Sequence, residues 1–174
     1  MSRTSVAIPD GARAYLDASV LYWHWAGVGD EQGCPEALCV EVVARCAGGS
    51  LLGLTALGTV AELVHKVLLL DIRRHTGRDR AHLVPWLKRH PEVVAQAVEH
   101  TRVIESLEAL GIEIVCNAVG DLQTATAISR QHGLLTNDAL IVATMQRLGL
   151  SWLATCDDDF DRVPWLQTWK PTTE

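Results

Sequence analysis

Short apolar runs alternate with amphipathic helical segments along the chain, and this order restricts the fold more than any other feature of the sequence. Strand-like runs lie at 13–17, 112–117, 151–155 and 166–171, with a further apolar piece at 51–55. Helical patterns lie between them, at 19–27, 35–48, 59–75, 91–111, 121–133 and 137–149. Strand-then-helix order favours a parallel sheet covered on both faces. We therefore predict an α/β fold whose mostly parallel central sheet has about five strands, with helices on both faces.

Two helix boundaries are predicted from local signals. Thr59 is expected to cap the helix over 59–75, and Glu62 three residues later completes a capping box. The apolar pattern from Pro91 to Gly111 predicts one continuous helix. Neither repeats nor low-complexity linkers interrupt the 174 residues, a length suited to a single domain. We expect that domain to span 1–174, with a core at roughly 13–171.

The composition excludes several classes of protein. Hydrophobic residues make up 48% and charged residues 21% of the chain, which is typical of a globular protein. No apolar run approaches the roughly 20 residues of a membrane-spanning helix, and the start of the chain lacks the apolar core of a signal peptide. Five scattered cysteines without a C-x-x-C pair indicate neither a disulfide framework nor a zinc site. We therefore expect a cytoplasmic protein without a membrane partner.

Four carboxylates fall within five positions of the stretch "TCDDDFDRV", at 157, 158, 159 and 161. Such density is tolerated when the acids are fully solvated, when protons neutralise some of them, or when a divalent cation lies among them. Asp157 ends a strand and is the expected metal ligand, whereas Asp158 and Asp161 are expected to face solvent. Asp159 either caps the following turn or reaches a second ion. A calcium loop fits poorly, because its central glycine and final glutamate are absent.

Three further acids occupy comparable places. Asp17 ends the first apolar strand, where the structural alternative is a cap for the next helix. Asp138 lies at the start of a predicted helix, where the helix dipole alone would favour an acid. Glu62 has two local alternatives, the capping box and an ion pair with Lys66. Strand ends and helix starts meet at one edge of a parallel sheet, so these acids and Asp157 can converge there as an oxygen-only ligand set, which suits Mg²⁺ or Mn²⁺.

The basic residues are distributed unevenly. Net charge is −6, which by itself disfavours a nucleic-acid partner. The window from Lys66 to His90, however, holds seven of the fifteen basic residues and only two acids. A solvated surface is one interpretation of this window, and a track for a polyanion is the other. The candidate contacts in the second interpretation are Arg73, Arg74, Arg78, Arg80, Lys88 and Arg89.

Several stretches of the chain carry a resemblance to a known family. They are "YLDASVL" near the start, "TVAEL" in the middle, "LLTNDALIVATM" in the third quarter, and "LATCDDDFDRV" with "WKP" near the end. These stretches resemble the PIN-domain nucleases, and in particular the VapC-type toxins of prokaryotic toxin–antitoxin pairs. The resemblance spans roughly Tyr15 to Pro171, and its last two blocks are the specific ones. The 45 residues from Asp17 to Glu62 are more than a compact toxin of this kind would have.

The resemblance assigns roles position by position. The catalytic acids that it implies are Asp17, Glu62, Asp138 and Asp157. Asp159 matches a further acid near the metals, and Thr155 and Ser19 match polar positions beside the acids. The residues that it implies as ligands of Mg²⁺ or Mn²⁺ are Asp17, Asp138 and Asp157.

The function that the resemblance implies is that of a metal-dependent endoribonuclease, in which the metal lowers the pKa of a water that attacks an RNA phosphodiester. It also implies an RNA substrate held by the basic window, a cognate antitoxin protein and a homodimer. Two alternatives remain: a stand-alone PIN ribonuclease in RNA processing or decay, and a degenerate, non-catalytic PIN module that serves as an RNA- or protein-binding platform. A phosphatase of the haloacid-dehalogenase type is disfavoured, because "DAS" stands where that class has D-x-D.

Overall fold

A five-stranded, entirely parallel sheet forms the centre of the computed structural model, which describes residues 7–27 and 36–171. Its strands are β1 (Arg13–Leu16), β2 (Leu52–Ala56), β3 (Glu113–Val115), β4 (Trp152–Ala154) and β5 (Gln167–Trp169). They lie side by side in the order β3-β2-β1-β4-β5. Every neighbouring pair is parallel, and the predicted α/β class is confirmed.

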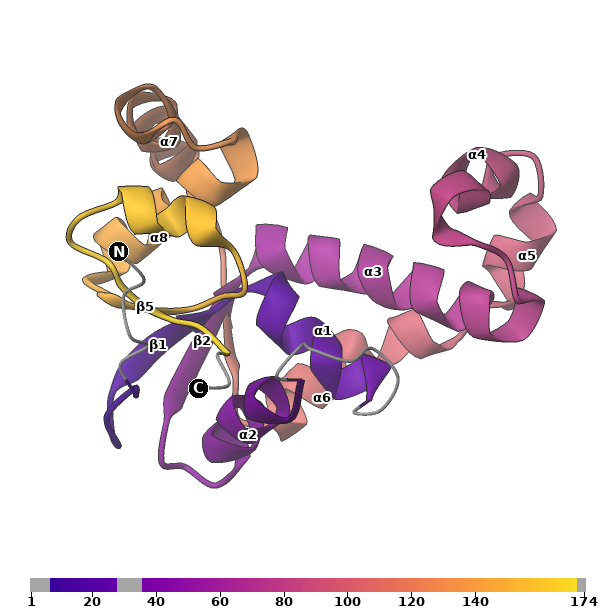
Figure 1. Ribbon diagram of the computed structural model, residues 1–174, viewed down its shortest axis with the longest axis horizontal. Helices are drawn as coiled ribbons and strands as arrows, with labels where there is room; N and C mark the ends of the chain where they lie inside the picture. The colour runs from indigo at the N-terminus through magenta and orange to yellow at the C-terminus, as the bar shows by residue number, and fades with distance from the viewer. Residues whose placement is uncertain (1–6, 28–35, 172–174) are drawn as a thin grey trace.

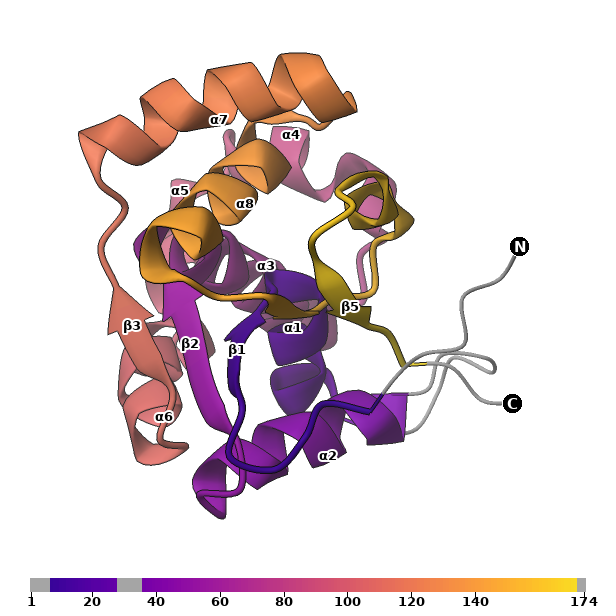
Figure 2. The same cartoon turned by 90° about the vertical axis from the view of Figure 1, so that its left-hand side faces the viewer.

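Helices cover both faces of this sheet (Figure 2). The helices on one side are α1 (Ala18–Ala26), α2 (Glu36–Ala47), the first half of α3 (Leu57–Thr76) and α6 (Val103–Ala109). On the other side lie α7 (Val119–His132) and α8 (Thr136–Leu148), at the top of Figure 2. None of the described helices combines the length and the apolar character needed to cross a bilayer.

Alternate side chains of β1 show why both faces need this cover. Ala14 and Leu16 pack into the core on the α1 side, whereas Tyr15 packs into the core beneath α7 and α8. All three side chains are fully buried. Successive residues of a strand point to opposite faces, so a strand that is apolar at every position must be covered on both sides. These two cores hold β1 at the centre of the sheet.

The order of the strands creates a switch point beside β1. The chain passes from β1 to β2 and β3 on one side, and later places β4 and β5 on the other side. Leu16 at the end of β1 lies opposite Ala154 at the end of β4, so Asp17 and Thr155 leave the sheet next to each other. In open parallel sheets, ligands bind beyond the carboxyl ends of the strands at such a point. We call this place the acid edge.

A helical arm extends from the sheet along the second half of α3 (Figure 1). Its short elements are η1 (Arg80–His82), α4 (Leu83–Leu87), α5 (Pro91–Gln96) and η2 (Glu99–Arg102). A small core of Ile72, Leu83 and Leu87, separate from the two main cores, holds these elements together. Where the arm returns to α3, the buried carboxylate of Asp71 accepts hydrogen bonds from the backbone N–H of Val98 and Glu99, at 3.0 and 3.2 Å.

Two predicted helix boundaries are wrong. The segment 91–111 is divided into α5, η2 and α6, because Ala97 has extended backbone angles and Asp71 binds the N–H groups that follow it. Helix α3 begins at Leu57, before Thr59, and the Thr59 hydroxyl instead forms a hydrogen bond of 2.6 Å with Tyr15. Thr59 is therefore not the cap of that helix. The predicted start of the 35–48 helix lies outside the described residues.

Candidate functional site

Asp17 follows β1 directly and is almost fully buried, with 8% of its surface exposed. One of its carboxylate oxygens accepts hydrogen bonds from the hydroxyls of Ser19 and Thr155, the latter at 2.9 Å. Burial raises the pKa of this carboxyl, and the two hydroxyl donors act in the opposite direction. Asp17 occupies the N-cap position of α1, but its side chain makes no capping hydrogen bond. The capping alternative is therefore wrong, and the carboxylate belongs to the acid edge.

Thr155 is fully buried and connects the ends of β1 and β4. Its hydroxyl donates to Asp17 and accepts from the backbone N–H of Asp157 at 3.1 Å. The Ser19 hydroxyl, which also donates to Asp17, accepts from the backbone N–H of Cys156 at 3.0 Å. Two hydroxyls thus fix the Asp17 carboxylate relative to the turn that carries Asp157.

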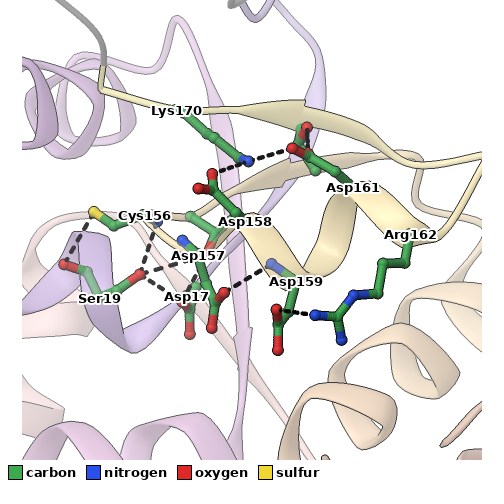
Figure 3. A network of polar contacts seen from close by, with 11 residues as sticks. Asp17, Ser19, Cys156, Asp157, Asp158, Asp159, Asp161, Arg162 and Lys170 are labelled. Carbon is green, nitrogen blue, oxygen red and sulfur yellow. Dashed lines mark hydrogen bonds and ion pairs between the residues drawn. The ribbon is translucent and has the colours of Figure 1, made fainter. Parts of the chain in front are cut away.

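The clustered acids divide into two groups that point in different directions (Figure 3). The carboxylates that point to the same side are those of Asp17, Asp157 and Asp159. Asp158 and Asp161 instead turn toward Lys170, and each forms an ion pair of 2.6 Å with its ammonium group. One lysine thus pairs with both outer acids, which the sequence predicted only to face solvent.

The turn after β4 is the short helix η3 (Asp158–Arg162), and its first acids have different partners. Asp157 is its N-cap, because its side chain accepts a hydrogen bond of 2.8 Å from the backbone N–H of Asp159. Asp159 itself forms an ion pair of 2.6 Å with Arg162. The predicted capping role of Asp159 therefore belongs to Asp157.

Asp138 lies in the first turn of α8, as predicted. Burial raises the pKa of its carboxyl to about 6, with further contributions from the charges of Asp157, Asp17, Asp159 and Glu62. Only charges that lie nearby shift a pKa in this way. The acids that follow β1 and β4 and the acid on α3 are therefore close enough to act on Asp138 in α8.

Glu62 lies on the second turn of α3 and forms the predicted ion pair with Lys66, at 2.7 Å. Both charges also act on Asp17, whose pKa is raised by Glu62 and lowered by Lys66. Lys66 is therefore a cation of the acid edge, a role that the sequence analysis did not assign to it. The signal for this role was its position one turn after an acid on the same helix face.

The donor chemistry of the acid edge suits a hard divalent cation. Carboxylate oxygens favour Mg²⁺ or Mn²⁺, and the repulsion that raises the pKa of Asp138 is what a cation would relieve. Across residues 7–27 and 36–171, no group of three or more His, Cys, Asp or Glu side chains forms a ready metal cage. Mg²⁺ usually keeps several waters and binds through one or two carboxylates, so the residues present fit the ion without such a cage.

The basic residues predicted to contact a polyanion lie along α3 and on the arm, away from the acid edge (Figure 1). From Glu62 to Arg73, helix α3 rises about 16 Å. Arg74 donates to two carbonyl oxygens at the end of α1, at 3.1 and 2.7 Å, so it also connects these two helices. Arg78 covers the ring of Trp86 at 4.0 Å. The residues of this set that are exposed without such a contact are Arg80, Lys88 and Arg89.

A polar network behind the acid edge was absent from the sequence predictions. Asp121 in α7 is 3% exposed, and the Arg147 guanidinium brackets it at 2.7 and 2.9 Å. Hydrogen bonding to Arg147 holds the pKa of Asp121 below its usual range. Through Thr144 the network reaches Asn117, whose amide oxygen accepts from the backbone N–H of Gly58 at 2.9 Å. The network therefore joins α7 and α8 to the start of α3, and two of these helices carry acids of the edge.

Comparison of sequences relates the chain to known proteins. The profile of the PIN domain family matches residues 59–166, well over half of the chain. Ribonuclease VapC6 of Methanocaldococcus jannaschii is 41% identical over 46 residues, which are 26% of this chain and 30% of that protein. This chain therefore matches less than a third of the length of that relative.

Solved structures share the fold at low sequence identity. A toxin–antitoxin complex from Klebsiella pneumoniae contains a chain with a TM-score of 0.55 and 18% identity, over 92% of this chain and 99% of that one. VapC20 of Mycobacterium tuberculosis, a toxin that cleaves the sarcin–ricin loop, has a TM-score of 0.57 and 12% identity, over 90% of this chain and 98% of that one. FitAcB of Neisseria gonorrhoeae has a TM-score of 0.56 and 18% identity, over 91% of this chain and 97% of that one. With its acids gathered at the switch point of a parallel sheet and the family profile matched over 59–166, the chain belongs to the PIN-domain family.

Proposed function

We propose that this chain is a metal-dependent endoribonuclease that hydrolyses RNA phosphodiester bonds, and that it is the toxin of a toxin–antitoxin pair. The observation that carries the proposal is the electrostatic coupling of Asp138 to Asp157, Asp17, Asp159 and Glu62. Carboxylates gathered beyond the strand ends suit a hard cation, and RNA hydrolysis is chemistry that such a cation assists. Membership of the PIN family and the likeness to Ribonuclease VapC6 support the same chemistry.

The acids of the edge would have separate roles. The residues that would hold Mg²⁺ or Mn²⁺, directly or through the waters that the ion keeps, are Asp17, Asp138 and Asp157, with Glu62 beside them. The hydroxyls of Ser19 and Thr155 would keep the buried Asp17 carboxylate in one orientation. Asp159, paired with Arg162, would add negative charge near the metal. The bound ion would supply positive charge for the scissile phosphate and a water of lowered pKa as the nucleophile.

The arm would bind the RNA backbone at a distance from the cut. Arg80, Lys88 and Arg89 are exposed positive charges, so they would attract the phosphates of a polyanion. The acid edge without a cation repels phosphate. An RNA strand would therefore lie along α3, with its scissile phosphate at the acid edge and flanking phosphates on the arm.

The partners that we propose are a cognate antitoxin protein and a second copy of the chain in a homodimer, both acting in the cytoplasm. The likeness in fold to a chain of a toxin–antitoxin complex supports the first. A basic side chain of the antitoxin would pair with the carboxylates of the acid edge, because charge-assisted hydrogen bonds to carboxylates are strong. Such a contact would block the metal and the RNA together.

Cleavage of total RNA by the purified full chain tests the activity. We expect fragments to form with Mg²⁺ or Mn²⁺ and not with EDTA. A chain that leaves the RNA intact with both metals would contradict the nuclease assignment and favour a non-catalytic module. Co-purification with the product of the neighbouring gene tests the toxin assignment, because a cognate antitoxin should suppress the cleavage. Cleavage that no neighbouring gene product suppresses would favour a stand-alone ribonuclease.

A further inference from the structure

Two cysteines from distant parts of the chain meet beside the acid edge. Cys39 lies in α2, and Cys156 lies 117 residues later in the turn between β4 and η3. Both are thiols, and their Sγ atoms are 4.0 Å apart. The sulfurs of a disulfide lie about 2.05 Å apart, so an approach of about 2 Å would bond them. We call these two residues the thiol pair.

The thiols of the pair differ in their access to solvent. Cys156 is exposed, whereas Cys39 is fully buried. Cys46, also in α2, offers a contrast, because burial raises the pKa of its thiol to about 11 and its sulfur donates to the carbonyl of Val42. Such a thiol stays protonated and inert. Redox-sensing cysteines are typically accessible and lie next to a second cysteine, and the thiol pair has both features.

Cys156 is hydrogen-bonded to the residue that orients the Asp17 carboxylate (Figure 3). Its backbone N–H donates to the Ser19 hydroxyl at 3.0 Å, and its Sγ–H donates to the Ser19 carbonyl at 3.7 Å. The Ser19 hydroxyl in turn donates to Asp17. Asp157 is the next residue along the chain. A movement of Cys156 is therefore transmitted to both carboxylates.

We propose that the thiol pair is a site of reversible oxidation at which hydrogen peroxide inactivates the acid edge. The peroxide oxidises the exposed Cys156 thiol to a sulfenic acid, and one water leaves. The Cys39 sulfur then attacks the sulfenic sulfur, and a second water leaves as the disulfide forms. Two thiols and one peroxide thus give one disulfide and two waters, and two electrons pass from the sulfurs to the peroxide. A dithiol reductant reverses the reaction by thiol–disulfide exchange, as happens in the cytosol.

The disulfide acts on the site through the backbone of Cys156. Closing the gap of 4.0 Å draws Cys156 toward α2 and removes the S–H donor to the Ser19 carbonyl. The position of the Asp157 carboxylate relative to Asp17 then changes. Mg²⁺ demands near-ideal octahedral geometry, and a misplacement of about 1 Å can cost about a hundred-fold in rate. This consequence rests on the proposed ribonuclease function, whereas formation of the disulfide does not.

Mass spectrometry of the full chain tests the disulfide independently of activity. The chain is treated with hydrogen peroxide, its remaining thiols are alkylated, and it is digested with trypsin and a glutamate-specific protease. These cuts place Cys34, Cys39, Cys116 and Cys156 on separate peptides. We expect a Cys39–Cys156 linkage that dithiothreitol removes. A linkage to another cysteine or between chains, or a Cys156 that stays unlinked, would overturn the proposal.

Two further measurements on the peroxide-treated chain follow the consequence. The rate of RNA cleavage with Mn²⁺ should fall about ten-fold or more and recover with dithiothreitol. The rise in melting temperature that Mn²⁺ causes should also shrink. Cys156→Ser and Cys39→Ala should resist peroxide in both measurements. Cys116→Ser, which changes an exposed cysteine outside the pair, should respond to peroxide as the wild type does.

These outcomes separate the thiol pair from the proposed function. If the untreated chain cleaves no RNA, the ribonuclease assignment fails, while the linkage and the melting shift still decide the oxidation site. A Cys156→Ser variant as sensitive to peroxide as the wild type would overturn the proposal. A linkage that changes neither the rate nor the melting shift would overturn the inactivation. Cys156→Ser changes an exposed side chain, and circular dichroism confirms that it folds.

Discussion

Two buried aspartates, Asp17 at the acid edge and Asp121 in the network behind it, have opposite surroundings. They are similarly buried, at 8% and 3% exposure. Asp121 is bracketed by the Arg147 guanidinium, and its pKa is lowered. Within the described part of the chain, Asp17 has no ion pair and relies on two hydroxyls, and its pKa is raised. A buried carboxylate with its own cation holds the structure together, whereas one without a cation remains available to pair with a ligand.

The largest expected effect comes from removing the charge of Asp17. Asp17→Asn keeps the size of the side chain and should reduce metal-dependent RNA cleavage at least about a hundred-fold, since even the partners of metal ligands contribute 10- to 100-fold. Its melting temperature without metal should not fall, because the raised pKa of Asp17 means that its buried charge opposes folding. Initial rates on a fluorescent RNA measure the effect.

Asp158→Asn is the matched control for that variant. Asp158 lies in the same acidic stretch but turns away to Lys170 and is exposed. We expect its cleavage rate to stay near that of the wild type. Equal loss of activity in the two variants would contradict the division of the acids into an inward and an outward group.

Asp121→Ala should affect stability more than any surface change. It removes the acceptor of two hydrogen bonds from Arg147, of one from the backbone N–H of Ala118 and of one from the Thr144 hydroxyl. Loss of hydrogen bonds to a charged, buried group costs about 2 kcal/mol. Urea unfolding followed by circular dichroism measures this as a lower midpoint with an unchanged slope. A midpoint equal to that of the wild type would show that the network does not stabilise the fold.

The two carboxyl environments predict opposite responses to pH. The pKa of Asp138 is raised from 3.8 to about 6, so its contribution to stability is greatest below pH 3.8 and is lost as pH rises through 6. The pKa of Asp121 is lowered. Its contribution to stability is therefore present above the usual pKa of an aspartate and is lost as pH falls through the lowered pKa. In EDTA, the melting temperature should therefore lose a few °C between pH 4 and pH 7, since solvent screens a half-buried carboxyl.

Asp138→Asn is the variant that assigns this pH dependence. It should remove the decline in melting temperature, and added Mn²⁺ should reverse the decline in the wild-type chain by binding the charged carboxylates. A decline of the same size in Asp138→Asn would assign it to other groups. The measurement is a thermal melt at each pH with chelator and with Mn²⁺.

The smallest expected effect concerns an ion pair on the exposed side of the acid edge. Arg162→Ala removes the partner of Asp159, and the two side chains are 50% and 37% exposed. Exposed ion pairs contribute about 0–1 kcal/mol, so the free energy of unfolding should change by less than about 1 kcal/mol. A loss as large as that of Asp121→Ala would show that burial is not what distinguishes the two kinds of acid. Urea unfolding measures it.

The alternation of short apolar runs with helical segments was sufficient to predict the parallel sheet, because the strand residues are buried on both faces and helices must cover them. The same argument placed Asp17 and Asp157 at strand ends. It would also have found Asn117, which follows β3 after a single residue and was overlooked. Strand ends are thus readable from sequence, whatever the type of polar residue that stands there.

Contacts between distant segments were not predictable in the same way. The 91–111 segment has an uninterrupted helical pattern, yet the Asp71 carboxylate from α3 fixes the N–H groups of Val98 and Glu99 and ends α5 early. Thr59 is a residue type that favours the cap position of a helix, but its hydroxyl forms a hydrogen bond with Tyr15 of β1. In both cases a side chain from elsewhere in the chain overrides the local signal, and periodicity contains no information about it.

The separate small core of Ile72, Leu83 and Leu87 has an evolutionary consequence. Because the arm folds around its own apolar residues, substitutions in it can accumulate without disturbing the two cores that hold the sheet. A lineage could therefore exchange or lengthen this extension while the acids at the strand ends stay in place.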